Sequence, residues 1–428
     1  MHWTRRRLLL SGASVCGVSL LGTARGKGIW SPHKGPYLLT IQCDGGWDPL
    51  MFCDPTGSSD FNRITDQIAY AGSIPYSPID PEADGLDFDD IDGVMSNQDF
   101  FETHSDRLLV LNGVRTDTIS HYQGRLRSWT GGIVAGYPTP TLGALFAGTQ
   151  APDLPLAFLS MGGIEHTAGL VPLSRFSGAD DLDTILHPYW NKRGDAFNTD
   201  AVRTQLDEAR QARSAALDAS LARQRDRDFL VEYEKVISDL HALYDFSLED
   251  VGDVLPPDLE DEAEGIRLMM AAFASGLAAA GNLQTGSFDT HGSDHDTVAP
   301  AEAARVWRLV DWAVTEAARV GVAEQLVILL GSDFGRGPAY NSSDGKGHAQ
   351  TTSFLIHSPL IEGNRVVGGR DKSGDALAVD PDNLTLSDAG EIMTPGTVHA
   401  AMRRLLSLDT ADNLAAYPID APDVYLFG

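Results

Sequence analysis

Cysteine is scarce in this chain of 428 residues, which contains only Cys16, Cys43 and Cys53. The sequence has no Cys-x-x-Cys pair, and this excludes a zinc ribbon and a thioredoxin-like redox motif. Cys43 and Cys53 could close a small disulfide loop in an oxidising compartment, and two reduced, buried cysteines explain them equally well. Cysteine usage therefore leaves the redox state of this pair open.

Basic residues are also few. Lys and Arg total 32 against 60 Asp and Glu, which gives a formal net charge of −28 at pH 7. A surface this acidic repels nucleic acid and anionic lipid, and it is compatible with divalent cations and with salty surroundings. The composition therefore predicts that the protein has no nucleic-acid partner.

The chain lacks a hydrophobic run that makes a convincing membrane span. Its N-terminal apolar stretch, residues 8–21, is interrupted by serine and glycine. Arg5 and Arg6 precede this stretch and small residues follow it at 22–24, as in a twin-arginine secretory signal. Residues 1–24 are therefore predicted to be a signal peptide. The mature protein is expected in the periplasm or outside the cell, after folded export by the twin-arginine translocase.

Two alternatives to a cleaved signal remain. One is an uncleaved N-terminal anchor. The other is a lipid anchor on Cys16, which agrees less well because residues 13–15 (Ala-Ser-Val) lack the leucine expected ahead of a lipid-bearing cysteine.

Replacing both Arg5 and Arg6 with lysine tests the export route. We expect the precursor to stay inside the cell, because the translocase reads a guanidinium pair that lysine replaces poorly. Cell fractionation followed by immunoblotting measures the outcome. Normal export of the double-lysine form would contradict the predicted route.

Strand and helix patterns alternate along residues 25–428, a length that suits one large α/β domain or two domains, and we predict a single domain. Short apolar runs predict strands at 37–42, 107–112, 154–159, 282–288, 325–330 and 352–356. Helices are predicted at 262–280, 301–320 and 394–407, the second with Pro300 at its start. This alternation predicts an α/β fold in which a mainly parallel sheet carries helices on both faces.

Residues 199–245 differ from the rest because they contain no proline or glycine. They are rich in Ala, Arg, Asp, Glu and Leu, which predicts one or two long amphipathic helices. With the closing Pro256 and Pro257, they are interpreted as a helical insertion at about 199–257. A coiled-coil arm is the alternative, although no sustained heptad pattern is present.

Polar side chains gather where the predicted strands end or begin. They are Asp44 and Asp48, then Ser120 and His121, then Asp289, His291 and His295, then Asp333 and Arg336, and finally His348. Functional residues of open α/β sheets lie beyond the carboxyl ends of the strands. Mixed carboxylate and imidazole ligands suit zinc, manganese or iron better than calcium. The pattern predicts one or two divalent ions, with zinc or manganese favoured; the alternative is that these residues only cap loops and helix starts.

Several of these motifs resemble those of a known family. They are residues 45–49 (Gly-Gly-Trp-Asp-Pro), 288–292 (Phe-Asp-Thr-His-Gly), 332–336 (Ser-Asp-Phe-Gly-Arg) and 345–348 (Gly-Lys-Gly-His). Together with shorter matches, they resemble the bacterial twin-arginine-exported proteins called domain-of-unknown-function family 1501, and the resemblance spans residues 37 to about 407. That family is similar to the alkaline phosphatase and sulfatase superfamily.

The resemblance implies an alkaline-phosphatase-like fold and a two-metal site. The ligands it implies are Asp48, Asp289, His291 or His295, Asp333 and His348. Asp44 is closer to its strand end, whereas Asp48 is the better motif match. Ser120 is the nucleophile by position, with water activated by metal as the alternative, and Arg336 with His121 would steady the anion. Phe334 stands where alkaline phosphatases carry a histidine ligand.

The leading hypothesis is therefore an exported, metal-dependent hydrolase of phosphate or sulfate esters, acting on a small anionic substrate. Its rival is a non-catalytic exported binding or assembly protein that keeps the fold. In that case the helices of residues 199–245 would contact a partner. Phe334 favours the rival, and the grouped Asp and His residues favour the enzyme.

Overall fold

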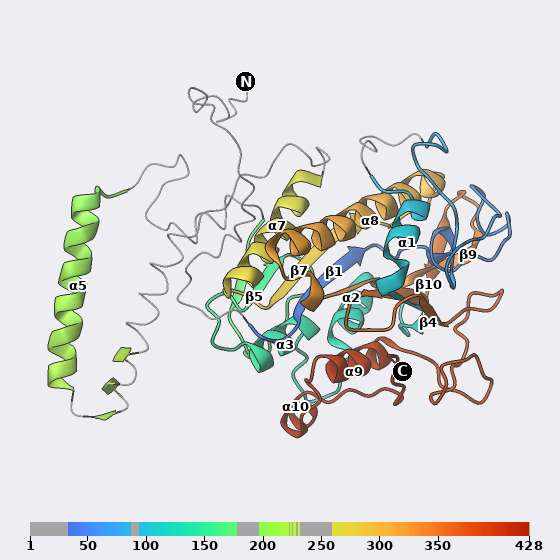
Figure 1. The fold of residues 1–428 in the computed structure, drawn as a ribbon. Coiled ribbons are helices and arrows are strands. Elements are labelled where there is room, and N and C mark those ends of the chain that lie inside the picture. Colours follow the sequence, from blue (N-terminus) through green and yellow to red (C-terminus); the bar gives the residue numbers. More distant parts are fainter. Residues whose placement is uncertain are drawn as a thin grey trace, which may run out of the picture.

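The computed structural model describes residues 33–86, 94–177, 197–221, 223–224, 226–227, 230–231 and 259–427. The predicted signal peptide and most of the predicted insertion beyond residue 221 lie outside these ranges, so both stay predictions. Within the insertion, helix α5 (Asp200–Ser220) is present as predicted and stands apart from the sheet in Figure 1. Across the described residues, no helix has both the length and the apolar character to cross a membrane.

The centre of the fold is one eight-stranded sheet. Its strands, in order across the sheet, are β12 (Arg365–Gly368), β4 (Leu108–Arg115), β11 (Thr351–His357), β8 (Leu326–Ser332), β1 (Tyr37–Asp44), β7 (Ala280–Ser287), β5 (Phe158–Met161) and β6 (Leu173–Arg175). Strand β11 pairs antiparallel with β4 and β8, and the other pairings are parallel. The predicted α/β fold with a mainly parallel sheet is therefore confirmed.

Helices cover both faces of this sheet (Figure 1). Helices α7 and α8 pack on one face, where α8 contacts β7 and β8, while α2 and α3 contact the same central strands from the other face. The helices are α1 (Asn97–His104), α2 (His121–Thr130), α3 (Leu142–Gln150), α5, α7 (Glu260–Ser275), α8 (His295–Val320), α9 (Pro395–Leu405) and α10 (Ala411–Ala416). Because both faces are covered, β1 and β8 are buried along almost their whole length instead of alternating between buried and exposed residues.

Strand β8 illustrates the cause of this arrangement. All seven of its residues are buried, and five of them are Leu, Val or Ile. Such side chains stabilise the fold by roughly 1.5–3 kcal/mol each when fully removed from water. The pairing of β1 with β8 and β7 then brings the carboxyl ends of three parallel strands to one edge of the sheet.

Helix α8 begins six residues earlier than the predicted start at residue 301. Its first residue is His295, so Pro300 lies inside the helix rather than at its start. A proline near the N-terminus of a helix removes one backbone hydrogen bond, and the buried face of α8 on the sheet compensates for that loss. This earlier start places His295 in the protein interior, with 0% exposure.

Two short hairpins complete the fold. Strands β2 (Ala69–Ala71) and β3 (Ile74–Tyr76) form one, and β9 (Gly335–Tyr340) and β10 (Lys346–Ala349) form the other. The second hairpin places His348 opposite Arg336. It therefore returns the chain to the edge where β8 ended, before β11 starts.

The two cysteines in the described part of the chain are both free and buried. Burial raises the pKa of the Cys43 thiol, and it does the same for Cys53. Both side chains belong to the apolar core, which agrees with the interpretation of Cys43 and Cys53 as reduced residues.

Candidate metal centre

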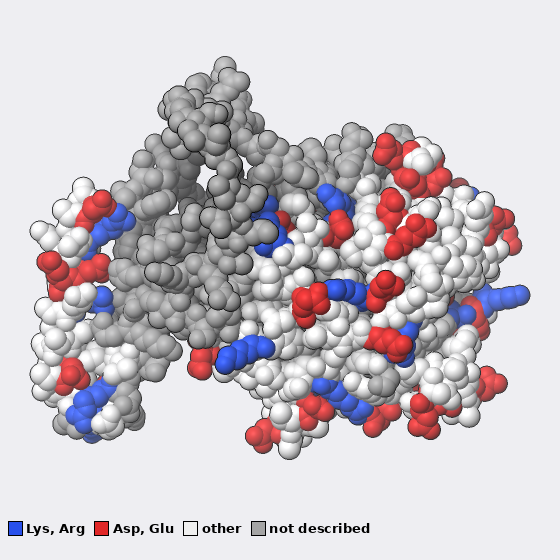
Figure 2. All heavy atoms as spheres, in the orientation of Figure 1, with Lys and Arg blue, Asp and Glu red and all other residues white. Residues whose placement is uncertain are grey.

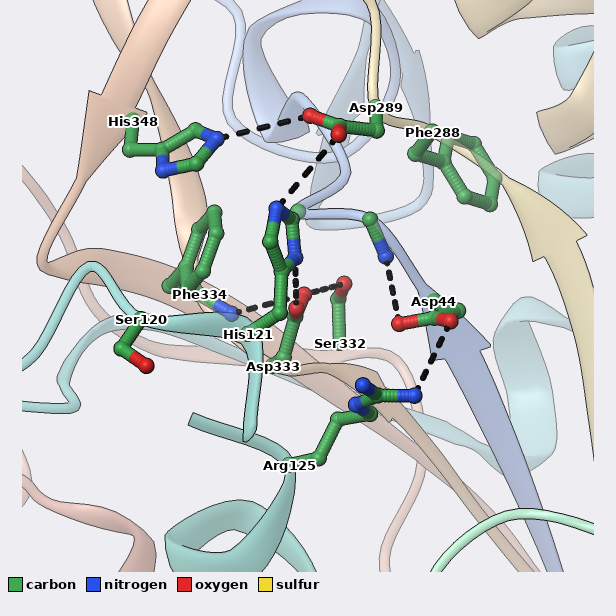
Figure 3. A network of polar contacts seen from close by, with 12 residues as sticks. Asp44, Ser120, His121, Arg125, Phe288, Asp289, Ser332, Asp333, Phe334 and His348 are labelled. Carbon is green, nitrogen blue, oxygen red and sulfur yellow. Dashed lines mark hydrogen bonds and ion pairs between the residues drawn. The ribbon is translucent and has the colours of Figure 1, made fainter. Parts of the chain in front are cut away.

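Residues from five separate segments meet at the carboxyl edge of the sheet (Figure 3). Asp44 ends β1, Asp289 follows β7, Asp333 follows β8, His121 opens α2 and His348 lies on β10. Parallel strands deliver their end residues to the same edge, and the β9–β10 hairpin adds a histidine from the far side. The sequence analysis predicted polar clusters at this edge of the sheet, and the side chains of these five residues lie close together there.

The first group consists of His121, Asp289 and His348, each with one ligand atom within 4.8 Å of the others. Asp289 lies between the two rings: its Oδ2 is 3.5 Å from His121 Nε2, and its Oδ1 is 3.4 Å from His348 Nε2. A carboxylate with two imidazole nitrogens is a donor set that zinc accepts.

The ring of His348 is held in one orientation. Its Nδ1 is 2.9 Å from the carbonyl oxygen of Ile119, and a carbonyl can only accept, so Nδ1 carries the hydrogen. Burial lowers the pKa of His348 below its ordinary value, which favours the neutral ring. The lone pair therefore lies on Nε2, the atom that faces Asp289. A carbonyl that fixes the tautomer in this way is typical of metal-ligating histidines.

His291 supports a cation at this position. Its Nε2 lies 2.8 Å from His348 Nε2 and 3.0 Å from Asp289 Oδ1. Two imidazole nitrogens at this distance repel unless a proton or a metal ion lies between their lone pairs. Zinc–nitrogen bonds are about 2.0–2.1 Å long, so both nitrogens can bind a single ion after a small adjustment. The residues present therefore match a divalent ion of the zinc or manganese class.

Asp289 is ionised in this setting. Burial acts to raise the pKa of Asp289, but the hydrogen bond and the charge of Arg336 outweigh it and hold the pKa below the ordinary value. The Arg336 guanidinium approaches Asp289 Oδ1 to 2.8 Å. Asp289 is therefore an anionic carboxylate that can bind a divalent ion, beside the positive charge of Arg336.

Arg336 does not have the role that the sequence suggested. Its side chain is 0% exposed, and its nitrogens donate to the backbone carbonyls of Gly45, Gly46, Phe288 and Lys346. A guanidinium enclosed by carbonyl oxygens cannot turn towards a substrate anion without leaving those oxygens unpaired. Arg336 instead fixes the backbone around Asp289.

The second group consists of Asp44, His121 and Asp333. Asp333 Oδ2 lies 2.7 Å from His121 Nδ1, and its Oδ1 accepts hydrogen bonds from Ser332 Oγ at 2.9 Å and the Phe334 amide at 3.1 Å. Burial raises the pKa of Asp333, although the hydrogen bonds from His121 and Ser332 oppose that rise. His121 thus connects the two groups, with one nitrogen on each side.

Two residues around Asp44 were absent from the sequence prediction. Arg125 Nη1 lies 3.2 Å and Gln284 Nε2 3.1 Å from Asp44 Oδ2. Arg125 follows His121 by four positions, so a helix beginning at His121 puts both on one face, and this spacing was the available signal. Gln284 is brought to Asp44 by the β1–β7 pairing, which no local pattern reveals.

Asp48 and His295 lie apart from both groups. Their side chains are 0% exposed, and His295 Nε2 is 3.2 Å from Asp48 Oδ2. The same oxygen lies 2.6 Å from Lys346 Nζ, a residue that the sequence prediction missed. Burial acts to raise the pKa of Asp48, but the charge of Lys346 and the hydrogen bond from His295 hold it well below its usual range. An ammonium group therefore stands where the sequence analysis expected a metal.

Ser120 and Phe334 are the remaining residues of the predicted site. Ser120 is the N-cap residue of α2, yet its side chain makes no capping bond, and its hydroxyl points away from Asp289 and His348 in Figure 3. Phe334 is fully buried, with its ring centroid 4.7 Å from that of His121 and 4.3 Å from that of His348. The ring packs against both histidines, so Phe334 forms an apolar wall of the site and supplies no ligand atom.

Comparisons with known proteins give limited information. No family model matches the chain, and no curated protein matches it, so membership of family 1501 stays a prediction. The chain is similar to a PsFucS1 sulfatase from Pseudoalteromonas sp., with 11% identity, a TM-score of 0.38 and coverage of 92% of this chain and 72% of that one. It is also similar to the TAB5 alkaline phosphatase, with 6% identity, a TM-score of 0.37 and coverage of 88% and 99%.

A third similar structure is the lipoteichoic acid synthase LtaP from Listeria monocytogenes, with 10% identity, a TM-score of 0.36 and coverage of 96% of this chain and 82% of that one. Similarity at these TM-scores carries no information about activity. The function is therefore inferred from the side chains of the site and from the sequence motifs.

Proposed function

We propose that the protein is an exported, metal-dependent hydrolase of phosphate or sulfate esters. The main support is the convergence of His121, Asp289 and His348 from a helix, a strand end and a hairpin that are far apart in sequence. Loop-capping side chains would point to nearby backbone amides. Here the imidazole and carboxylate atoms face one another instead, and the ester class follows from the motif resemblance.

The residues of the site have different roles in binding the metal and the substrate. Asp289 supplies negative charge, and the carbonyl of Ile119 presents the lone pair of His348 to the same point. When bound there, a divalent ion supplies Lewis-acid polarisation of an ester oxygen. Arg125, whose side chain is 31% exposed beside Asp44, keeps a face with which to contact a substrate anion. Water is the nucleophile we favour, since the Ser120 hydroxyl is turned away from the group.

The predicted export and the excess of acidic residues agree with this function. The predicted twin-arginine signal supports a location in the periplasm or outside the cell. Among the described residues on the face drawn in Figure 2, acidic side chains are spread among the basic ones without a continuous basic surface. Such a surface suits a small substrate that reaches a localised cation better than it suits a polyanionic nucleic acid.

One observation favours a second candidate, a binding protein that keeps the metal but does not catalyse. The buried Phe334 ring occupies the wall between His121 and His348 and offers no ligand atom. A site reduced in this way could hold one ion for structure or for recognition of a partner. The two candidates differ in whether an ester is turned over, not in whether metal binds.

Hydrolysis assays on the purified mature protein separate these candidates. Metal-free protein and protein reloaded with Zn²⁺ or Mn²⁺ are each given nitrophenyl phosphate and nitrophenyl sulfate, and release of nitrophenol is measured. We expect one of the two esters to be hydrolysed only by the reloaded protein. Metal binding without turnover of either ester would favour the binding protein, and protein that binds neither metal would exclude both candidates.

A further inference from the structure

A buried ionic cluster lies beside the first metal group. It consists of Asp48, His295 and Lys346, and the side chains of all three are 0% exposed. Asp48 Oδ2 accepts from Lys346 Nζ at 2.6 Å, and His295 Nε2 lies 3.2 Å from the same oxygen. Lys346 Nζ also donates to the carbonyl of Phe61 at 2.5 Å. The cluster is therefore internally neutralised and needs no added cation.

One path connects this cluster to the loop after β7. His295 Nδ1 lies 2.7 Å from Thr290 Oγ1. Thr290 is the residue between Asp289 and His291, and its side chain is buried. Because its side chain is tied to the first residue of α8, the loop cannot shift without breaking a buried hydrogen bond. The orientation of Asp289 and His291 thus depends on His295.

A second path connects the cluster to the β9–β10 hairpin. Lys346 precedes His348 by two residues on β10, so the buried ammonium anchors the strand that carries the histidine. The carbonyl of Lys346 accepts from Arg336 Nη1 at 3.1 Å, and Arg336 Nη2 is 2.8 Å from Asp289 Oδ1. Both sides of the metal group are thereby joined to the same ion pair.

We propose that Asp48, His295 and Lys346 form a positioning cluster, which sets the separation between the Asp289 loop and His348 and does not itself bind the metal. This inference rests on the proposed metal site. A metal group works only when its ligands are held close to their bound geometry by surrounding hydrogen bonds and packing. The cluster supplies this support from two elements at once, through Thr290 and through β10.

Substitutions that remove the charges without changing size test this role. The variants are Asp48→Asn, Lys346→Met and the two combined, with Zn²⁺ affinity measured by calorimetric titration and stability by urea unfolding. Each single variant leaves a buried charge without its partner and should be strongly destabilised, whereas the double variant removes both charges and should regain most of that stability. We nevertheless expect the double variant to bind Zn²⁺ about tenfold or more weakly than the native protein.

Arg267→Met combined with Glu316→Gln is the matched control. This pair joins α7 to α8 at 2.9 Å, away from the metal group, with side chains 13% and 2% exposed. Because Glu316 also pairs with Arg319 at 2.9 Å, this double variant should lower stability, and it should leave Zn²⁺ affinity unchanged.

Three outcomes would overturn the inference. In the first, the double variant binds Zn²⁺ as tightly as the native protein, so the cluster serves stability alone. In the second, Asp48→Asn removes one bound ion from the stoichiometry, so Asp48 is itself a ligand. In the third, the native protein binds no Zn²⁺ or Mn²⁺, which also removes the proposed function. The first two outcomes leave the proposed function intact, so its failure is distinguishable from that of the inference.

Discussion

Replacing both Asp289 and His348 with alanine is expected to abolish metal binding by the purified protein. The double variant removes the charge at the centre of the first group and the nitrogen fixed by Ile119. Loss of supporting residues alone weakens metal sites by about 10–100-fold, so loss of two ligands should exceed that range. Metal content by mass spectrometry and titration with Zn²⁺ or Mn²⁺ measure the result.

The fold should survive this change. Arg336 loses its carboxylate partner but keeps backbone carbonyls as acceptors, so the buried guanidinium is still hydrogen-bonded. His166→Ala, which removes an exposed imidazole elsewhere, is the matched control and should bind metal normally. A double variant that retained the native ion content would place the metal away from this edge and would contradict the proposed centre.

Gly45→Ala should also damage the site, through the backbone rather than through a ligand. Gly45 has a φ of +95°, and an added Cβ would lie 2.5 Å from the amide nitrogen of Asp289. Neither the left-handed conformation nor the contact with a rigid backbone can be relieved by rotating a side chain. We expect a loss of more than about 2 kcal/mol in the free energy of unfolding, together with weaker metal binding because Asp289 is displaced.

Gly136→Ala separates the two causes. Gly136 also has a positive φ, +84°, but nothing lies within 4 Å of its Cβ position. This variant should therefore show only the conformational cost, about 1–2 kcal/mol, with unchanged metal affinity. If both alanine variants lost the same stability and bound metal equally well, close packing of Gly45 on the Asp289 loop would not matter for the site.

The sheet was predictable from sequence because its strands are signalled locally. The segments around Leu38, Leu109 and Ile328 are mostly apolar runs that end in polar residues. Both the strands and the sheet edge at which their polar residues gather could therefore be predicted. The start of α8 could not be predicted from a local sequence pattern. Pro300 is normally a sign of a helix beginning, and only the packing of α8 on the sheet carries the helix through it.

The candidate site was predictable in part for a related reason. Asp289 and His348 were predicted as metal ligands because strand order brings their segments together, and topology follows from the alternation of strands and helices. His121 was predicted only to steady the substrate anion, whereas the structure places it in both candidate metal groups. Which acidic residue meets which cation depends on side-chain direction. Lys346 belongs to the motif at residues 345–348, but the sequence analysis gave it no role, and in the structure its ammonium neutralises Asp48 in the interior. Sequence spacing contains no information about that pairing.

His121 has a further consequence for how the two groups behave together. Its imidazole is a flat, rigid ring with Nδ1 2.7 Å from Asp333 Oδ2 and Nε2 3.5 Å from Asp289 Oδ2. The distance between its two nitrogens cannot change, so the ring is a rigid spacer between the two carboxylates. Because His121 is the first residue of α2, a small tilt of that helix would move the whole imidazole ring. The ring would then approach one carboxylate and move away from the other, so binding of an ion at one group would change the geometry of the other.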